Sequence, residues 1–468
     1  MNGSKKEKKK REFPHVFVML LAITAIAAIF TYILPAGQYD MVEGPGGRMV
    51  ADPNSFRYID QTPVGLFDMV MSIPRGMEDI GFIIFFILIV GGAFHVLNAT
   101  GAIEAGLGKL AKSFAGKESL LIPVMMLAFA IFGSTFGMAE ETIPFVPIMI
   151  ALALALKFDS ITGVAIVFVG AAAGFTSGII NPFTVGVAQG IAELPLFSAL
   201  GFRIVIFAVM VSASIFFVMR HANRVKLNPS QSPVYALDQS REGMMDLNAL
   251  PELTGKRKLI LVVLFATIAM LIFGVMRLGW YIEELSALFL IMAFVVALIG
   301  GLGMNGFGTK LAEGMAGIAG GAVIVGFARA IVIVLTDGNI LHTILYNVSN
   351  ALLGFPAMIA AVGMYVFQSF LNYLIPSGSG QAAVTMPIMA PLADLVGVTR
   401  QTSVVAFHIA DGIANVIMPT SGYFMAGLAL AKIQWHTWAK WILPLIGFQY
   451  LLGAIFVIIA QAIQLGPF

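Results

Sequence analysis

Apolar residues occur along this chain in long runs that short polar segments separate. Nine runs are long enough to cross a bilayer as a helix. They cover residues 15–35, 79–98, 160–191, 197–220, 258–277, 285–303, 316–335, 401–431 and 438–465. Because about 20 consecutive apolar residues are needed to span the hydrocarbon core, this pattern predicts an all-α polytopic membrane protein.

Two further apolar stretches, 119–157 and 355–396, are interrupted near their middles by glycine and hydroxyl residues. The interruptions fall at residues 133–137 and 376–380. Each is interpreted as the tip of a re-entrant hairpin, because non-helical backbone is tolerated at membrane depth only where protein or water satisfies it. If the first stretch were two full spans, the basic cluster at residues 220–258 would lie outside the cytoplasm.

Charge supports this topology, with the N-terminus inside and the C-terminus outside. The chain is 59% hydrophobic and only 11% charged, whereas soluble domains carry about 25% charged residues. With nine spans, 20 of the 27 Lys and Arg residues lie on the cytoplasmic side and 5 outside, as the positive-inside rule requires. The run at 15–35 is longer than the apolar core of a signal peptide, so it is expected to remain as a span.

The chain also contains an internal repeat, in which residues 72–210 resemble residues 309–446. Matching segments include Gly76-Met77 with Gly314-Met315, and Pro147-Ile148-Met149 with Pro387-Ile388-Met389. Each copy would hold two spans, a hairpin, a broken span and a closing span. One extra span between the copies inverts the second, and inverted repeats with broken helices are typical of secondary transporters.

This repeat defines the predicted organisation of the chain. It consists of an N-terminal repeat at 1–220 (hairpin 119–157, broken helix 160–191), a cytoplasmic linker at 221–257, a connecting span at 258–277, and a C-terminal repeat at 285–468 (hairpin 355–396, broken helix 401–431). Residues 36–78 are expected to form an external loop. The segments 101–117 and 338–353 are expected to be amphipathic helices at opposite faces.

The hairpin tips are the first candidates for a binding site. Their hydroxyl and glycine residues are Ser134, Thr135 and Gly137 in one half, and Ser377, Gly378, Ser379 and Gly380 in the other. Glycine lets the backbone approach a ligand, and N–H groups at the start of a half-helix attract anions. Small residues also permit tight helix packing, but their matching positions in two repeats favour a ligand or ion site.

The broken spans supply further polar candidates: Asn181 and Thr184 in the first half, and Asn415, Thr420 and Ser421 in the second. Both groups flank a proline in the middle of a span, and such a proline removes a backbone donor. An ordinary proline kink is the alternative. The amide and hydroxyl side chains beside both prolines favour unwound segments that line a ligand site.

Ionisable residues inside spans are costly and are usually functional. Glu140 and Glu141 follow the first tip, Asp411 lies in the second broken span, and Arg329 lies in the span at 316–335. Arg329 would pair with one of these acids, either for neutralisation alone or as part of a site. If all stay ionised, three carboxylates against one guanidinium leave an excess of about two negative charges, which would hold a cationic group or protons.

Other ionisable residues are expected to have structural roles. His95 and His408 would be satisfied buried side chains, Arg203 would extend its guanidinium to the outer interface, and Asp159, Glu193 and Asp394 would cap helices or face water. The chain has no Cys, and neither a nucleophile triad, an HExxH metal motif nor a phosphate-binding loop stands out. These observations predict that the chain is not an enzyme and does not bind nucleic acid.

Several of these segments resemble those of the YfcC family, which is grouped with the C4-dicarboxylate anaerobic carriers in the ion transporter superfamily. The matching segments are Leu34-Pro35-Ala36-Gly37, Phe136-Gly137-Met138-Ala139-Glu140-Glu141, Asn181-Pro182-Phe183, Ser377-Gly378-Ser379-Gly380-Gln381-Ala382-Ala383, Met386-Pro387, Asp394-Leu395-Val396-Gly397-Val398 and Asp411-Gly412. The resemblance implies a secondary transporter of the bacterial inner membrane, whose tips and broken helices line the substrate and ion sites. The resemblance adds Gln381 to the candidate site residues. Homodimers and elevator-type motion are common in that superfamily.

The resemblance leaves two substrate classes open, basic amino acids exchanged as in arginine/ornithine antiport, and C4-dicarboxylates. The excess of carboxylates favours the amino acid, with Arg329 or tip N–H groups holding its α-carboxylate. Glu140, Glu141 or Asp411 would then hold its amines, whereas they would repel a dicarboxylate unless protonated or paired. Superfamily members with Ser-Asn-Thr tips bind Na⁺. Because the tips differ here, Na⁺ and H⁺ both remain candidates for the coupling ion, and no other cofactor is expected.

A channel is a remote alternative to a transporter.

Overall fold

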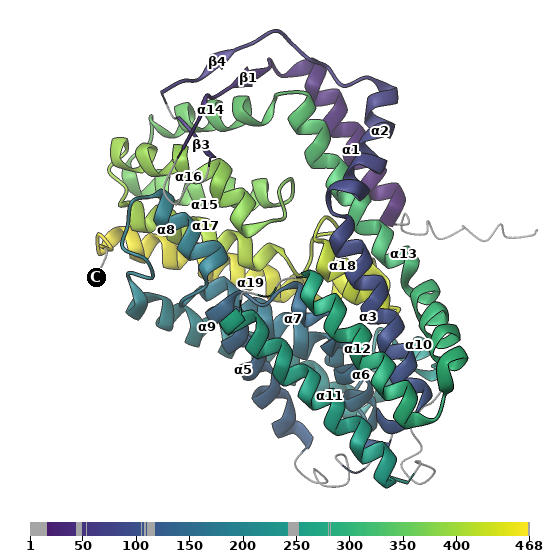
Figure 1. The fold of residues 1–468 in the computed structure, drawn as a ribbon. Helices are drawn as coiled ribbons and strands as arrows, with labels where there is room; N and C mark the ends of the chain where they lie inside the picture. Colours follow the sequence, from purple (N-terminus) through teal and green to yellow (C-terminus); the bar gives the residue numbers. More distant parts are fainter. Residues whose placement is uncertain are drawn as a thin grey trace, which may run out of the picture.

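The computed structural model shows an all-α polytopic membrane protein (Figure 1). It describes residues 16–43, 49–52, 54–103, 105–106, 109, 118–241, 252–278, 280 and 282–466. Within these ranges the strands form two short antiparallel pairs: β1 (Gly37–Gln38) with β4 (Arg57–Tyr58), and β2 (Met41–Glu43) with β3 (Met49–Ala51). Most of the helix expected at 101–117 lies outside the described residues.

Seven of the described helices are long and apolar enough to cross a membrane. They are α1 (Val16–Ile33), α3 (Gly81–Ala99), α7 (Ser160–Ser177), α9 (Leu200–Leu227), α12 (Ile282–Gly300), α13 (Gly303–Asp337) and α19 (Trp435–Ala462). Each corresponds to one predicted span. The span expected at 258–277 corresponds to α11 (Gly255–Phe273), whose first turn is basic, and the one expected at 401–431 is divided between two shorter helices. The nine-span topology stays a prediction.

Some boundaries differ from those expected from the sequence. The predicted external loop at 36–78 contains the strand pairs and also a helix, α2 (Leu66–Asp79), which lies directly before α3. Helix α9 runs on to Leu227, into the predicted linker at 221–257. That segment also forms a short helix, α10 (Tyr235–Gln239), after the turn η4 (Pro229–Gln231). The amphipathic helix expected at 338–353 is present as α14 (Leu341–Leu352).

The helices that follow α3 and α13 come in a similar order. After α3 the chain forms α5 (Glu118–Phe136), the 3₁₀ turn η2 (Glu140–Thr142), α6 (Phe145–Ala155), α7, the π-helical turn η3 (Pro182–Gly186), α8 (Val187–Ile191) and α9. After α13 and α14 it forms α15 (Ala357–Asn372), α16 (Gly378–Leu395), α17 (Arg400–Ala414), α18 (Gly422–Leu430) and α19. The inverted relation between the two series stays a prediction.

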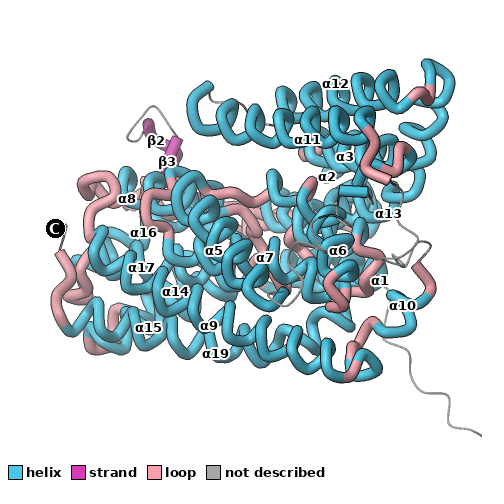
Figure 2. Tube along the Cα trace, turned by 90° about the horizontal axis from the view of Figure 1, so that it is seen from below, coloured by secondary structure: helices cyan, strands magenta, loops and turns pink. Residues whose placement is uncertain are grey.

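Packing divides the helices into two groups (Figures 1 and 2). The first group contains α1, α2, α3, α11, α12 and α13, with α3 packed against both α12 and α13. The second group contains α5 to α9 and α15 to α19, with α7 and α17 in contact at its centre. Helix α13 also packs against α18. The two broken helices therefore lie in one group, and α13 of the other group contacts the second of them through α18.

Small residues allow the helices of the second group to approach closely. A Cβ at Gly174 of α7 would lie 1.8 Å from the carbonyl oxygen of Ala130 in α5, and one at Gly133 would lie 2.2 Å from that of Ala171. A side chain at either position would therefore separate α5 from α7. This close contact holds the last turns of α5, which precede the first tip, against α7.

A buried polar cluster ties the start of α7 to the end of α9 and to the segment after it. Asp159 caps α7, because its Oδ1 accepts the Thr162 N–H at 2.9 Å. Its Oδ2 accepts hydrogen bonds from Ser232 Oγ at 2.7 Å and from His221 Nε2 at 2.9 Å. Burial alone would raise the pKa of Asp159, but these hydrogen bonds outweigh it and hold the pKa below its usual value.

Asp159→Asn is predicted to destabilise the protein at pH 7, by about 1–3 kcal/mol, because buried donors lose a charged acceptor. A carboxyl with a depressed pKa contributes stability above its unfolded pKa of about 3.9, and this contribution is lost as pH falls. The difference in Tm between wild type and variant should therefore shrink below about pH 4. Thermal unfolding of the purified protein across pH tests this, with exposed Asp60→Asn as the control; an unchanging difference would contradict it.

Candidate functional site

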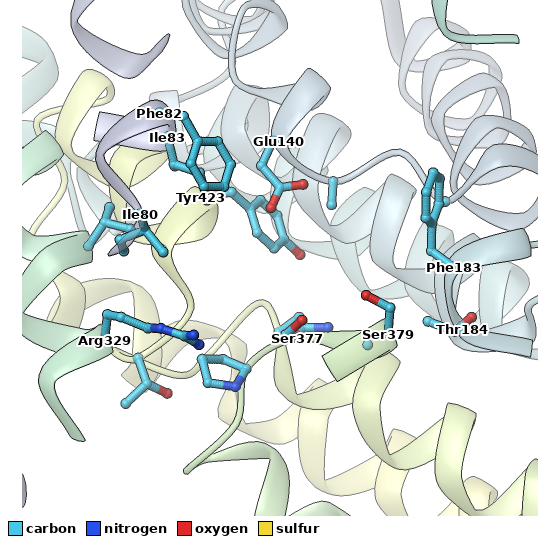
Figure 3. A pocket seen from close by; sticks show the side chains of 18 of the residues that line it. Ile80, Phe82, Ile83, Glu140, Phe183, Thr184, Arg329, Ser377, Ser379 and Tyr423 are labelled. Carbon is cyan, nitrogen blue, oxygen red and sulfur yellow. The ribbon is translucent and has the colours of Figure 1, made fainter. Parts of the chain in front are cut away.

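A cavity of about 360 Å³ lies at the boundary between the two helix groups (Figure 3). Its lining from the first group comes from the α2–α3 junction and from α13. Its lining from the second group comes from the break after α5, the turn η3, the start of α16 and the break before α18. The segments that interrupt the helices thus meet around one cavity.

Ten of the residues expected from the sequence line this cavity: Gly137, Glu140, Glu141, Thr184, Arg329, Ser377, Gly378, Ser379, Asn415 and Thr420. The other seven, Ser134, Thr135, Asn181, Gly380, Gln381, Asp411 and Ser421, do not line it. Most of these seven instead hold the lining segments in place, as their hydrogen bonds show.

The first break begins four residues later than expected, at Gly137 rather than at Gly133. Helix α5 continues to Phe136, so Ser134 and Thr135 are helical, and both hydroxyls donate to the carbonyl oxygen of Ile131, at 3.0 and 2.7 Å. Such bonds to the preceding turn satisfy a hydroxyl inside a helix. The chain leaves the helix at Gly137, whose φ of 69° lies in the left-handed region that favours glycine.

The acidic pair follows this break in the turn η2. Glu141 is 6% exposed, and its Oε2 accepts the N–H of Ala139 at 3.0 Å. Glu140 is less buried, and its carboxylate points into the cavity beside the ring of Tyr423 (Figure 3). Both acids therefore line the same cavity.

On the other side of the cavity, α16 begins at the second tip. Ser377 caps this helix, and its Oγ accepts the N–H of Gly380 at 3.3 Å. The first-turn N–H groups of α16 and the hydroxyls of Ser377 and Ser379 are thus presented near the cavity (Figure 3). Helix N-termini of this kind favour negatively charged groups.

The polar residues behind this tip form a buried network. Asn372 Nδ2 donates to Asp411 Oδ1 at 2.6 Å and to Gln381 Oε1 at 2.8 Å. Gln381 in turn donates to the Oε1 of Gln368 at 2.7 Å. Asp411 is fully buried, and its Oδ2 lies 3.0 Å from the position that a Cβ on Gly378 would occupy. The carboxylate thus lies directly behind the α16 tip rather than in the cavity wall.

The broken helices supply the remaining polar lining. Helix α7 ends at Ser177, and Asn181 caps the next turn, with its Oδ1 accepting the Phe183 N–H at 2.9 Å. Thr184 follows and reaches the cavity wall. In the other half α17 ends at Ala414, and Asn415 and Thr420 line the cavity from the non-helical segment before α18. Ser421, next to Thr420, is buried outside it.

Arg329 pairs with a residue that the sequence analysis did not select. Its Nε donates to Asp79 Oδ2, and no described contact joins it to Glu140, Glu141 or Asp411, the partners expected from the sequence. Asp79 lines the cavity as the last residue of α2. The only sequence signal was an acid directly before an apolar span, and no spacing rule connects it to a residue 250 positions away.

Aromatic side chains are the second feature that the sequence analysis missed. Phe82, Phe175, Phe183 and Tyr423 line the cavity. Tyr423 adds a hydroxyl close to Glu140 (Figure 3). In a chain with 37 Phe and 10 Tyr residues, nothing in the sequence distinguishes these four from aromatic residues that face lipid or the core.

Two other expectations about ionisable residues were wrong. Arg203 does not extend to the interface: it is 0% exposed, and its Nε donates to the carbonyl oxygen of Ile179 at 3.4 Å, just beyond the end of α7. A cation is favourable near a helix C-terminus. His95 is half-exposed rather than buried, and its Nε2 lies 3.3 Å from Glu313 Oε2.

Residues at the helix ends follow the expectation more closely. Besides the cap formed by Asp159, Glu193 and Asp394 both face solvent and pair with Arg400, at 2.7 and 2.8 Å. His408 is fully buried in α17, as expected, but neither of its ring nitrogens has a hydrogen-bond partner among the described residues. These residues lie outside the cavity lining.

The lining is rich in acidic groups. It contains the carboxyl groups of Asp79, Glu140 and Glu141, and Arg329 is the one basic residue in the described lining. Three carboxyls therefore face one guanidinium, as in the set expected from the sequence, with Asp79 in place of Asp411. Hydroxyl, amide and aromatic groups complete the lining, a mixture that is common in small-molecule sites.

Comparison with known proteins relates the chain to transporters. The family model of DcuC, the C4-dicarboxylate anaerobic carrier, matches residues 13–462. YfcC of Escherichia coli (strain K12), which is named as a candidate basic amino acid antiporter, is 35% identical over 97% of this chain and 98% of its own. An uncharacterized protein of Haemophilus influenzae is 30% identical over 98% and 99% of the two chains.

A solved structure also aligns with the chain. The YdaH transporter of Alcanivorax borkumensis is 16% identical, with 97% of this chain and all of that chain covered, at a TM-score of 0.43. At that level the likeness carries no argument about the site.

Gly378→Ala is predicted to destabilise the contact between the two halves. The new Cβ would lie 2.5 Å from Thr184 Cγ2, and such overpacking costs about 1–3 kcal/mol. Thr184→Ser removes this methyl group and should partly restore the Tm of the Gly378→Ala variant. Thermal unfolding of the two single variants and the double variant tests the contact as a double-mutant cycle. Strictly additive effects would contradict it.

Proposed function

The chain belongs to the C4-dicarboxylate anaerobic carrier (DcuC) family, and from that premise we propose that it exchanges basic amino acids of the arginine/ornithine type across the bacterial inner membrane. Membership makes it a transporter rather than an enzyme. The proposed mechanism is alternating access, in which the cavity opens to one side of the membrane at a time.

The observation that carries the proposal is the acidic lining of the cavity. Glu140 and Glu141 come from one turn, and the one basic residue in the described lining, Arg329, is already paired with Asp79. Two carboxylates without a basic partner in the described lining favour a substrate with a cationic side chain. The name of the Escherichia coli relative supports the same substrate class.

A C4-dicarboxylate is the second candidate, because the family takes its name from such substrates. A dicarboxylate would enter a cavity that already carries excess negative charge, so its transport would require protons on the acids or a bound Na⁺. Asp411, buried with Asn372 behind the α16 tip, is the residue we assign to such a coupling cation. Exchange of one basic amino acid for another needs no coupling ion.

The position of the cavity supports alternating access. It lies between the two helix groups, so that a shift of one group relative to the other would change which side of the cavity is open. We propose that the N-terminus lies in the cytoplasm, because the positive-inside rule favours that orientation for nine spans.

Counterflow in proteoliposomes is the direct test of the substrate. Vesicles that contain the full-length protein are loaded with unlabelled ornithine or arginine, and labelled arginine is added outside. Parallel vesicles are loaded with fumarate or succinate and receive labelled succinate. We expect uptake only in the basic amino acid arm. Uptake only in the dicarboxylate arm would show that the acids are neutralised in the protein, and the charge argument would be wrong.

Glu140→Gln and Glu141→Gln are each predicted to reduce arginine counterflow by about tenfold or more, because a charged hydrogen bond is worth about 1.5–3 kcal/mol. Both variants should reach wild-type levels in the membrane. Glu313→Gln is the matched control, because this exposed glutamate lies outside the cavity and should leave counterflow unchanged. Normal exchange by both cavity variants would remove these acids from the site.

A further inference from the structure

Two ion pairs join α2 to α13, and the basic residue belongs to α2 in one pair and to α13 in the other. Arg75 of α2 pairs with Asp337 at the end of α13, and Asp79, one turn further along α2, pairs with Arg329 of α13. Between them the backbones approach closely, because a Cβ at Gly76 would lie 2.6 Å from the carbonyl oxygen of Gly326. The two pairs thus belong to one tight interface, but only the second reaches the cavity.

The two arginines are engaged differently. Arg75 binds Asp337 through both terminal nitrogens, with NH1 at 2.5 Å and NH2 at 3.1 Å from the two carboxylate oxygens. Arg329 holds Asp79 through Nε, and the structure gives its two terminal nitrogens no hydrogen bond to any described residue. Figure 3 shows its guanidinium pointing into the cavity toward Ser377. This fork is the geometry that binds a carboxylate with two hydrogen bonds.

The negative charge of Asp79 is not stabilised by its own helix. It is the last residue of α2, and a negative charge at a helix C-terminus opposes the helix dipole. Its side chain is 47% exposed and that of Arg329 is 35% exposed, and both line the cavity. An ion pair at this exposure contributes little to stability, so opening it costs little.

We propose that the Asp79–Arg329 pair is the recognition point for the α-ammonium and α-carboxylate groups of an amino-acid substrate. The inference rests on the proposed function and adds Asp79 to the site. On binding, the terminal nitrogens of Arg329 take the α-carboxylate and Asp79 takes the α-ammonium. Glu140 and Glu141, which come from the other helix group, hold the cation at the end of the side chain.

This arrangement explains how an acidic cavity accepts a molecule that carries a carboxylate. The α-carbon end of an amino acid is a zwitterion with no net charge, and so is the ion pair that it contacts. The exchange of partners therefore leaves the local charge balanced. A dicarboxylate could use Arg329 but would offer no cation to Asp79, so the pair also selects against it.

The test compares arginine with two analogues that each lack one group. Agmatine has no α-carboxylate, and 5-guanidinopentanoate has no α-ammonium. Each is used as a competitor of labelled arginine counterflow in proteoliposomes with the full-length protein. In wild type each analogue should compete about tenfold more weakly than arginine, or worse, because it loses charged hydrogen bonds.

The variants assign each group to its partner. In the Arg329→Gln variant, arginine should compete no better than agmatine, and competition by agmatine itself should change little. In the Asp79→Asn variant, arginine should compete no better than 5-guanidinopentanoate, and competition by that analogue should change little. Arg329→Lys keeps the positive charge but loses the guanidinium fork, so its preference for arginine over agmatine should be intermediate. It replaces Arg329→Gln in the test if that variant does not fold. Arg75→Gln, which breaks the other ion pair of the same interface, should keep the wild-type ratios.

The outcomes separate this inference from the proposed function. If wild type exchanges arginine but agmatine competes equally well, or if Arg329→Gln leaves the arginine to agmatine ratio unchanged, the recognition role of the pair is wrong and basic amino acid exchange stands. If wild type does not exchange arginine at all, the proposed function fails and the inference fails with it.

Discussion

A chain inside a bilayer must satisfy its backbone hydrogen bonds within the protein, and this constraint governs every place where the present chain leaves the helix. In the first half the two breaks satisfy each other. The N–H of Ile180, between α7 and η3, donates to the carbonyl oxygen of Ser134 at 3.0 Å. Asn181 caps the following turn, and its Oδ1 would be 2.7 Å from a Cβ on Gly137. A substitution at one break therefore disturbs the other.

In the second half, long side chains satisfy backbone groups where the helix is interrupted. The indole N–H groups of Trp435 and Trp438, at the start of α19, donate to the carbonyl oxygens of Ile417 and Val416, at 2.7 and 2.8 Å. These carbonyls lie in the segment between α17 and α18, where the helix has stopped. With the buried polar network behind Gly378, they fix the second pair of breaks against the first. The cavity is the space that remains where these breaks meet.

The sequence predicted which segments break, because glycine, proline and hydroxyl residues inside apolar runs mark them, and most of the lining comes from these segments. It could not predict hydrogen bonds that depend on helix phase, so Ser134 and Thr135 were placed at a tip although their hydroxyls bond within α5. Nor could it predict contacts between distant elements. The pairing of Arg329 with Asp79 and the burial of Arg203 both depend on how α13 and α9 pack, which periodicity does not encode.

The location of the charges then connects recognition to motion. Asp79 and Arg329 belong to the helix group built on α3 and α13, whereas Glu140, Glu141 and the α16 tip belong to the group built on α7 and α17. A substrate that contacts both sets bridges the boundary between the groups, so its binding energy depends on their relative position. A ligand shifts a conformational equilibrium only through such a difference in affinity. On the proposed function, a molecule charged at both ends is therefore suited to stabilise the closed arrangement, and one that lacks either end would bind without closing it.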